Sequence, residues 1–255
     1  MIYRYEADKV IDDNAIYGFM DGSLDFNPAN LTAGKELLNI ISRDVKKPVF
    51  YFCEVRQSHG SGIIVLDKYF KKNFSGMESR SVFYSRNADG IFTCESGIAL
   101  CIRTADCVPV LFISLSRSGS RKSVIGAVHC GWKGAYGGIL KNAKNVLENK
   151  FNDSAGNVSV IIGPSICGRC YEVKEDFLNL FLTRDISSEK FFIKDKNKNK
   201  IFFDLKAFIK DELVLIGFNG KNIYDLNKCN FEDAKFFSYR RNKNDGRQVS
   251  FIALL

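Results

Sequence analysis

The chain contains two histidines, and each follows an apolar run at the point where it meets a glycine-rich turn. His59 lies within the turn 57–62, and one residue separates His129 from the turn 131–134. Glycine allows a backbone to approach a ligand closely, and functional side chains commonly lie on loops that follow strands. A single histidine is more often a structural residue, but two in the same context favour a functional site.

A polar segment, 103–109, interrupts an apolar run between the histidines and places Asp106 beside Cys107. Two imidazoles and one thiolate form a ligand set that zinc accepts, with the fourth tetrahedral position open for catalysis. The sequence therefore predicts that His59, Cys107 and His129 bind a metal and take part in catalysis. Asp106 is predicted either to carry protons or to orient a histidine.

Candidate anion-binding groups lie in two later segments. The turn 131–134 precedes the clearest helical periodicity, at 134–151, and a helix start with Lys133 beside it favours an anion. Arg240 and Arg241 offer guanidinium groups that can bind phosphate in a bidentate manner. The alternative for the glycines in and after this turn is that they merely allow close helix packing.

The elements that must position these residues are strands and helices in uneven alternation. Apolar strand-like runs occur at 49–56, 62–66, 97–103, 108–113, 124–128 and 158–162, with closing strands at 200–203 and 249–252. Further helices are predicted at 174–182 and 207–216. Runs that are apolar throughout are typical of sheets covered on both faces. The predicted class is α+β (mixed α/β) with a mixed sheet.

Composition limits the classes of function. The chain has 255 residues with 45% hydrophobic content and no Pro-rich linker, which predicts one domain over 1–255. The net charge of +8 is not accompanied by the spacing of a nucleic-acid-binding motif, so no nucleic-acid partner is expected. No run approaches the 18 apolar residues of a membrane span, and the start of the chain lacks a signal-peptide pattern. We therefore expect a cytoplasmic protein without a membrane partner.

Eight cysteines in a chain without a secretion signal indicate reduced thiols rather than disulfides. Cys167 and Cys170 have the C-x-x-C spacing of metal or redox sites. One pair supplies only half of a structural zinc site, and a thioredoxin-like context is not recognisable. The role of this pair stays open at the level of sequence.

Short motifs along most of the chain resemble, in the same order, those of the YfiH-type family, also called laccase-domain or polyphenol oxidase-like proteins. The motifs are Gln57-Ser-His-Gly60, Ala88-Asp-Gly90, Thr104-Ala-Asp-Cys107, Ala127-Val-His-Cys-Gly-Trp-Lys-Gly134, Ile162-Gly-Pro-Ser-Ile166, Cys170-Tyr-Glu-Val173 and Phe236-Phe-Ser-Tyr-Arg-Arg241 with Gly246-Arg247. The resemblance implies a layered α/β/β/α-like fold and a metal held by the same two histidines and cysteine. Zinc is the expected cofactor, with copper as the alternative.

The resemblance also implies phosphorolysis of adenosine, inosine, guanosine and methylthioadenosine to the free base and a ribose 1-phosphate, with adenosine deamination as a second activity. The expected partners are thus a purine nucleoside and phosphate. Lys133, Arg240 and Arg241 are the predicted phosphate ligands, and Trp132 or Tyr171 is expected to pack against the base. Lys133 stands where the family usually has arginine, so it would contact phosphate as a point charge.

Three alternatives remain from the sequence. Cys107 could be the nucleophile and His129 the base of a cysteine hydrolase, an amidase that edits peptidoglycan precursors. Copper-dependent phenol oxidation follows the family's older name, although two histidines are too few for a multicopper centre. A non-enzymatic protein could hold structural zinc with Cys130 as a fourth ligand. The preferred purine and the oligomeric state are left open.

Overall fold

The computed structural model describes residues 1–3, 14–26, 33–44, 49, 51–69, 81–116, 122–195, 197 and 199–255. Two six-stranded sheets form its centre. The first sheet has the order β1 (Ile2–Tyr3), β2 (Ala15–Met20), β15 (Gln248–Leu254), β7 (Ile98–Thr104), β3 (Tyr51–Arg56), β5 (Ser81–Asn87). The second sheet has the order β14 (Ile223–Asp225), β10 (Ser159–Ile162), β8 (Val108–Ser114), β9 (Val124–Cys130), β6 (Gly90–Thr93), β4 (Ile63–Leu66).

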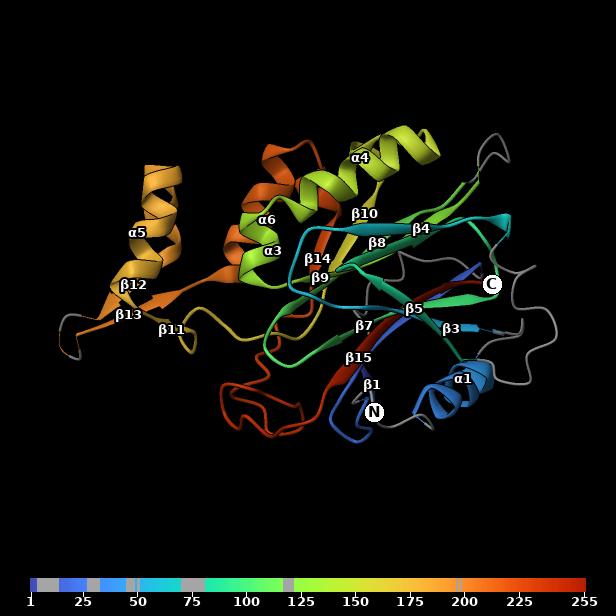
Figure 1. Cartoon of the computed structure of the whole chain (residues 1–255), viewed down its shortest axis with the longest axis horizontal. Helices are drawn as coiled ribbons and strands as arrows, with labels where there is room; N and C mark the ends of the chain where they lie inside the picture. The colour runs from blue at the N-terminus through green and yellow to red at the C-terminus, as the bar shows by residue number, and fades with distance from the viewer. Residues whose placement is uncertain are drawn as a thin grey trace.

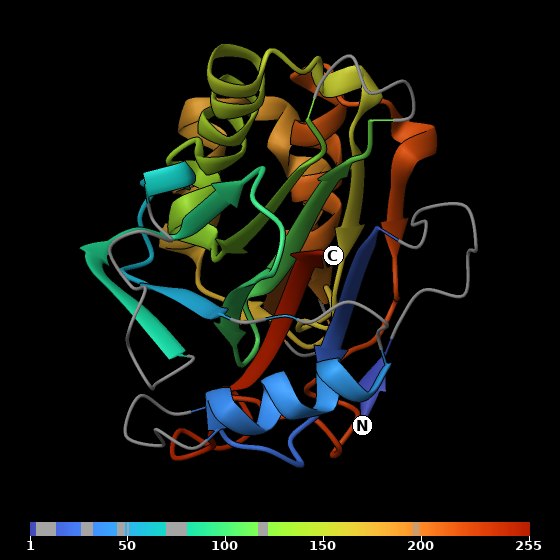
Figure 2. The ribbon, with the colours of Figure 1, turned by 90° about the vertical axis from the view of Figure 1, so that its right-hand side faces the viewer.

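Helices cover the outer face of each sheet. The first sheet is covered by α1 (Ala33–Asp44), and the second by α3 (Trp132–Tyr136), α4 (Ile139–Phe151) and α6 (Leu205–Leu215). A small sheet of β11 (Glu172–Val173), β13 (Lys200–Phe203) and β12 (Phe192–Asp195) lies with α5 (Glu175–Arg184) at one end of the molecule (Figure 1). Short 3-10 turns occupy Ala155–Asn157, Ile186–Phe191 and Gly220–Asn222. Figure 2 shows the resulting helix, sheet, sheet, helix order, which confirms the predicted layered class.

Alternate residues of the central strands enter different cores. In β9, Ile125 and Ala127 face the first sheet, whereas Val124 and Val128 face the helices. Both sets are at most 1% exposed. Because each face of the second sheet is covered, its strands are apolar throughout instead of alternating. The predicted strands at 108–113 and 124–128 are confirmed for this reason, and the predicted strand at 97–103 is confirmed as β7 of the first sheet, whose two faces are also buried.

The prediction of one continuous helix over 134–151 was wrong. The segment 134–151 is divided into α3, which ends at Tyr136, and α4, which begins at Ile139. Gly138 between them has a φ of 83°, a left-handed conformation that a right-handed helix cannot contain. The turn 131–134 therefore opens a helix of five residues and not the long helix α4. Within the described part of the chain, no helix is both long and apolar enough to cross a membrane.

The connections between the sheets determine where the site lies. The chain passes from the first sheet to the second three times, between β3 and β4, β5 and β6, and β7 and β8. Because β3 runs parallel to both β5 and β7, these three connections leave the first sheet at the same edge. β15 is antiparallel to β7 and starts with Gln248 opposite Thr104, so the segment 226–247 also reaches this edge.

Candidate active site

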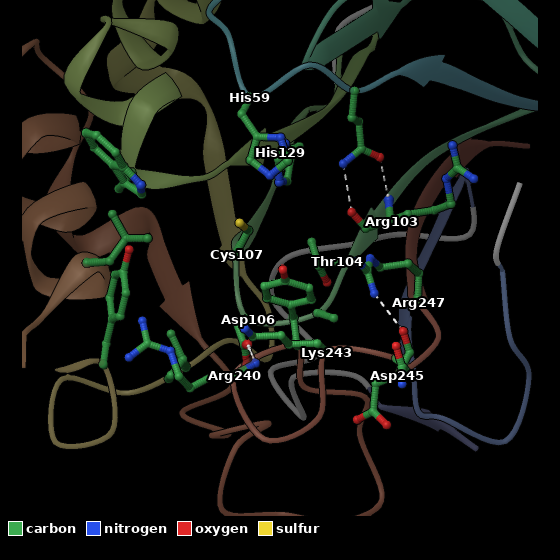
Figure 3. A pocket seen from close by; sticks show the side chains of 18 residues that line it. His59, Arg103, Thr104, Asp106, Cys107, His129, Arg240, Lys243, Asp245 and Arg247 are labelled. Carbon is green, nitrogen blue, oxygen red and sulfur yellow. Dashed lines mark hydrogen bonds between the residues drawn. The ribbon is translucent and has the colours of Figure 1, made fainter. Parts of the chain in front are cut away.

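The connections at this edge bring together the three predicted metal ligands. His59 lies in the β3–β4 connection, Cys107 in the β7–β8 connection, and His129 near the end of β9. Their ligand atoms all lie within 4.8 Å of one another, and the two imidazole rings meet edge to face. Figure 3 shows the Cys107 sulfur pointing toward the rings. The polar interruption at 103–109 is thus the passage of the chain from one sheet to the other.

Asp89, in the β5–β6 connection, holds two of these ligands in place. His129 Nδ1 donates a hydrogen bond to Asp89 Oδ1 at 2.7 Å, which leaves Nε2 of His129 for the cluster. The same carboxylate accepts hydrogen bonds from the backbone N–H groups of Ser58, His59 and Gly60 at 2.7–3.2 Å. Burial opposes its charge, but these donors keep the pKa of Asp89 below its ordinary value. One fully buried carboxylate therefore positions both histidines.

The backbone around the cluster adopts conformations that ordinary residues avoid. His59 has a φ of 59° and Asp106 a φ of 91°, and such strain costs about 1–3 kcal/mol per residue. Gly131 packs directly over the cluster, since a Cβ there would lie 3.1 Å from Cys107 Sγ and 3.3 Å from His59 Cδ2. The strained turns and the missing side chain allow the three ligands to converge.

The electrostatics of the cluster favour a charged pair. Burial alone would disfavour ionisation of Cys107, but His129 and His59 outweigh it and lower the pKa of the thiol to about 6. Burial alone would also lower the pKa of His129, whereas the Cys107 thiolate and Asp89 raise it to about 9. A thiolate that lies among two imidazoles is both a metal ligand and a nucleophile.

The donor set fits zinc. Two imidazole nitrogens and a thiolate sulfur are ligands that zinc prefers, and an imidazole fixed by a carboxylate is the usual support for them. Cys130, considered as a fourth ligand, is fully buried in the core between the second sheet and its helices. The closed structural site with Cys130 is therefore contradicted, because this side chain points away from the cluster.

A cavity of about 960 Å³ opens beside the cluster (Figure 3). Its basic lining residues are Arg103, Arg240, Lys243 and Arg247, and its acidic ones are Asp106 and Asp245. Its aromatic lining residues are Trp132, Tyr171 and Tyr239. The cavity therefore combines the cluster with cationic groups for an anion and with flat rings for a planar ligand.

Asp106 lines the cavity, but it does not orient a histidine. Its carboxylate accepts hydrogen bonds from Ser238 Oγ at 2.7 Å and from the backbone N–H of Arg240 at 2.6 Å. Burial raises the pKa of Asp106, although these two donors oppose the shift. The structure thus corrects one alternative from the sequence, because Asp89 has the orienting role and Asp106 holds the segment that contains Arg240.

The predicted phosphate ligands have different surroundings. Arg240 lines the cavity with its guanidinium carbon 5.1 Å from the centre of the Tyr171 ring. Arg241 lies outside the lining and donates hydrogen bonds to the backbone carbonyls of Asn230, Phe231 and Phe236. Its guanidinium braces a loop and does not face the cavity.

Lys133 is exposed on α3 and also lies outside the lining, with its ammonium 5.7 Å from the centre of the Trp132 ring. Among the predicted substrate ligands, Trp132 and Arg240 reach the cavity, whereas Lys133 and Arg241 do not.

Several residues of the site were missed or given no role by sequence reasoning. Arg103 is one, and its guanidinium Nε lies 3.1 Å from buried Glu54 on β3. Gln57 fixes the backbone at Arg103 with two hydrogen bonds of 2.7 and 2.8 Å. Asp89 is the most important omission, and an acidic residue in the turn 88–90 after a strand-like run was the available signal.

The chain is similar to several known proteins. The family model described as multi-copper polyphenol oxidoreductase laccase matches residues 33–255. A Rickettsia conorii protein named purine nucleoside phosphorylase is 34% identical over 188 residues, which cover 73% of this chain and 69% of the relative. A protein named adenosine deaminase, from an unknown prokaryotic organism, is 29% identical over 201 residues, which cover 77% of this chain and 72% of the relative.

A solved structure shares the fold. The crystal structure of a Bacillus licheniformis hypothetical protein, YfiH, aligns with a TM-score of 0.77 and 22% sequence identity, and the alignment covers 98% of this chain and 100% of that one. The family match extends from α1 to the end of β15 and includes every connection that contributes to the cavity. The chain therefore belongs to the YfiH-type, laccase-domain family.

Proposed function

We propose that this protein is a metal-dependent purine nucleoside phosphorylase with an associated adenosine deaminase activity. The observation that carries the proposal is one cavity that combines the His59, Cys107 and His129 cluster with arginines and aromatic rings. The relatives named purine nucleoside phosphorylase and adenosine deaminase support the same assignment. The substrates would be adenosine, inosine, guanosine and methylthioadenosine, together with phosphate.

The metal would be held by the two imidazoles and the thiolate of the cluster. Zinc bound there would act as a Lewis acid on a substrate atom. Asp89 would keep His129 and the His59 loop fixed, so that the ligands need not reorganise during the reaction. The positions of both histidines are thus part of the proposed mechanism.

Phosphorolysis requires the phosphate, the ribose and the base to lie together in the cavity. A phosphate oxygen forms a bond to C1′ of the ribose while the bond from C1′ to the purine nitrogen breaks, and the released base takes up a proton. Arg240 and Arg247 line the cavity and would bind the phosphate, and Trp132 and Tyr171 also line it and would pack against the purine. The sugar would lie between these groups.

Deamination would use the same cavity with water in place of phosphate. Water adds to C6 of adenosine and ammonia leaves, so a proton must move from the water to the departing nitrogen. Asp106 is the candidate carrier, because burial raises its pKa and its carboxylate lines the cavity. This proposed role is independent of the orienting role that belongs to Asp89.

The first experiment is an assay of inosine with and without phosphate. We expect hypoxanthine to be released only when phosphate is present, together with ribose 1-phosphate in equal amount. A strong zinc chelator should abolish the release, and added zinc should restore it. Release of base without phosphate, or no release from any of the four nucleosides, would contradict the proposed phosphorolysis.

A cysteine hydrolase is the second candidate, and the charged pair of Cys107 and His129 favours it. A thiol with a pKa of about 6 is ionised at neutral pH and can attack an amide carbonyl. Zinc would occupy the sulfur that this reaction needs. Alkylation of Cys107 by iodoacetamide separates the candidates: zinc should protect the sulfur if the site binds metal, whereas an amidase would react in the presence of zinc.

Copper-dependent phenol oxidation is the third candidate, and it follows the family description. A multicopper centre requires many imidazoles, whereas the whole sequence contains two histidines. The donor set therefore supports phenol oxidation less well than phosphorolysis.

A further inference from the structure

Three cysteines outside the active site lie together although they come from two distant segments. Cys167 and Cys170 lie between β10 and β11, and Cys229 lies with Glu232 between β14 and β15. The three sulfur atoms and a carboxylate oxygen of Glu232 all lie within 4.8 Å of one another. We propose that these four residues form a second, structural zinc site, which does not depend on the proposed function.

The donor set suits zinc, which binds cysteine thiolates and carboxylate oxygens, and four protein ligands are usual in a structural zinc site. A tetrahedral zinc ion with Zn–S distances of about 2.3 Å separates its ligand atoms by about 3.8 Å. Cys170 Sγ and Glu232 Oε1 are 3.5 Å apart, so this pair needs little movement to bind the ion. Four protein ligands close the coordination sphere, and the described lining of the cavity includes none of the four.

Backbone amides surround the sulfur of Cys229. The N–H of Cys167 donates to Cys229 Sγ at 3.3 Å, and the N–H groups of Phe231 and Glu232 are directed at the same atom. Burial raises the pKa of the Cys229 thiol, but amide N–H groups directed at its sulfur oppose that shift and favour the thiolate, which is the form that binds a metal. This arrangement therefore supports a metal ligand at Cys229.

A redox-active pair of Cys167 and Cys170 explains the arrangement of the four side chains less well than a zinc site does. A disulfide would join two of the three cysteines and would leave the third sulfur and Glu232 without a function. Reactive C-x-x-C thiols usually lie at the start of a helix, whereas Cys167 and Cys170 lie in a turn before β11 and the next helix begins at Glu175. The turn also packs closely against Asp204, because a Cβ at Gly168 would lie 2.7 Å from that side chain.

The zinc would join two segments that form one wall of the cavity. Ile166 and Tyr171 line the cavity on either side of the cysteine pair, and Arg240 packs on the Tyr171 ring. On the other segment, Arg241 holds the two backbone carbonyls that follow Cys229. The second site would therefore position Tyr171 and Arg240 without contacting a substrate.

Metal content tests the second site directly. Purified under reducing conditions with zinc, the wild-type protein should contain about two zinc ions per chain, and Cys107→Ala should retain about one. Adding Cys229→Ser to Cys107→Ala should remove the remaining zinc. Cys94→Ser is the matched control, because Cys94 is half-buried and outside both clusters, and it should retain both ions.

Two results would overturn the second site. One is a single zinc in the wild-type protein that disappears completely in Cys107→Ala. The other is a Cys167–Cys170 disulfide, found by mass spectrometry of the unreduced protein after alkylation of free thiols.

Cobalt(II) bound to Cys107→Ala provides an independent readout, since that variant keeps all four proposed ligands. A tetrahedral thiolate site gives intense visible bands and sulfur-to-metal charge transfer, whereas the weak spectrum of hydrated cobalt would count against the site.

The positioning role of the second zinc rests on the proposed function and has a separate test. Cys229→Ser should raise the KM for phosphate several-fold, while the zinc of the active site and its sensitivity to chelators stay as in the wild type. An unchanged KM would overturn the positioning role. If the wild-type protein shows no phosphorolysis, the proposed function fails, and the zinc content of the double variant still decides the second site.

Discussion

The two clusters of metal-binding side chains differ in both their ligands and their surroundings. The active-site cluster has three ligands, two of them imidazoles, and faces the cavity. The second cluster has three thiols and a half-exposed carboxylate, and it lies outside the cavity lining. A site with three protein ligands leaves one position for a substrate, whereas four ligands close it. The comparison suggests that one fold separates catalysis from structural support by the number of ligands.

The supports of the two clusters differ as well. Cys107 lies beside β8 and His129 lies on β9, two strands whose residues are all buried, and Asp89 fixes His129 and the loop that contains His59. The second cluster joins two loops that pair with each other through one isolated parallel β-bridge, between Ser165 and Cys229, and not through longer strands. Strands and Asp89 already position the proposed metal ligands of the active-site cluster, so a metal bound there would be available for chemistry. Loops lack that support, so a metal between them would contribute to their stability.

The strongest test of the difference between the two clusters replaces one cysteine of each cluster in turn. Cys107→Ala should lower kcat for inosine by at least about 10³-fold, because it removes a metal ligand at the reaction site. Cys229→Ser should lower kcat by less than about tenfold, because its metal touches no substrate. Steady-state kinetics at saturating phosphate give both values. Equal losses in the two variants, with both proteins folded by circular dichroism, would contradict the separation of roles.

The response of metal binding to pH should also separate the clusters. Zinc binding needs deprotonated thiols and a neutral imidazole. Near pH 7.5, Cys107 with a pKa of about 6 is largely ionised, but His129 with a pKa of about 9 must lose a proton. Zinc affinity at the active site should therefore rise about tenfold per pH unit between about pH 7 and 8.5.

At the second cluster, the dependence on pH should be steeper. Burial raises the pKa of Cys170 and of Cys229, so both thiols lose protons when zinc binds. We expect zinc affinity to rise about 100-fold per pH unit or more over the same range. Chelator competition on Cys229→Ser reports the active site alone, and the same titration on Cys107→Ala reports the second cluster. If zinc affinity rises equally steeply with pH in both variants, the protonation states inferred for the two clusters are wrong.

The sequence singled out the three residues that the structure brings together at the candidate active site, and the reason is physical. His59, Cys107 and His129 each stand beside an apolar strand that the sequence reveals clearly, so their types and positions were informative. Sheets covered on both faces were predictable for the same reason, since such strands are apolar throughout, whereas the layered order was implied by the family resemblance. The sequence did not reveal that the connections after β3, β5 and β7 cross from one sheet to the other at the same edge. Their common position depends on the pairing of strands that are far apart in the sequence.

Residues that act through others were harder to predict. Asp89 and Asp106 are both acidic residues in turns next to strands, and only the fold decides which one meets a histidine. Arg240 and Arg241 are neighbours in the sequence but point to different partners. Adjacent residues of a loop have no fixed periodicity, so pattern reasoning could not separate them. Cys229 lies 59 residues after Cys170, and no spacing rule connects the two.

Asp89→Asn tests whether a rigid support explains the active site. The amide keeps the size of the side chain but removes its charge, which should weaken zinc binding by about 10–100-fold. Zinc affinity of the second cluster should not change. Zinc titration of Asp89→Asn in the Cys229→Ser background measures the effect, and Asp233→Asn is a matched control because Asp233 lies outside the cavity lining. An unchanged affinity would mean that the strands alone position the histidines.

The smallest expected effect separates two neighbouring arginines. Arg240→Ala should raise the KM for phosphate about tenfold, which corresponds to ~1.4 kcal/mol and is typical of one charge-assisted hydrogen bond. Arg241→Ala should leave that KM nearly unchanged and lower the free energy of unfolding by about 1–3 kcal/mol, because three backbone carbonyls lose their donor. Kinetics and urea unfolding of both variants give the values. If Arg241→Ala affects the KM more than Arg240→Ala does, the arginine that binds phosphate has been assigned wrongly, and the wall of the cavity must rearrange when phosphate enters.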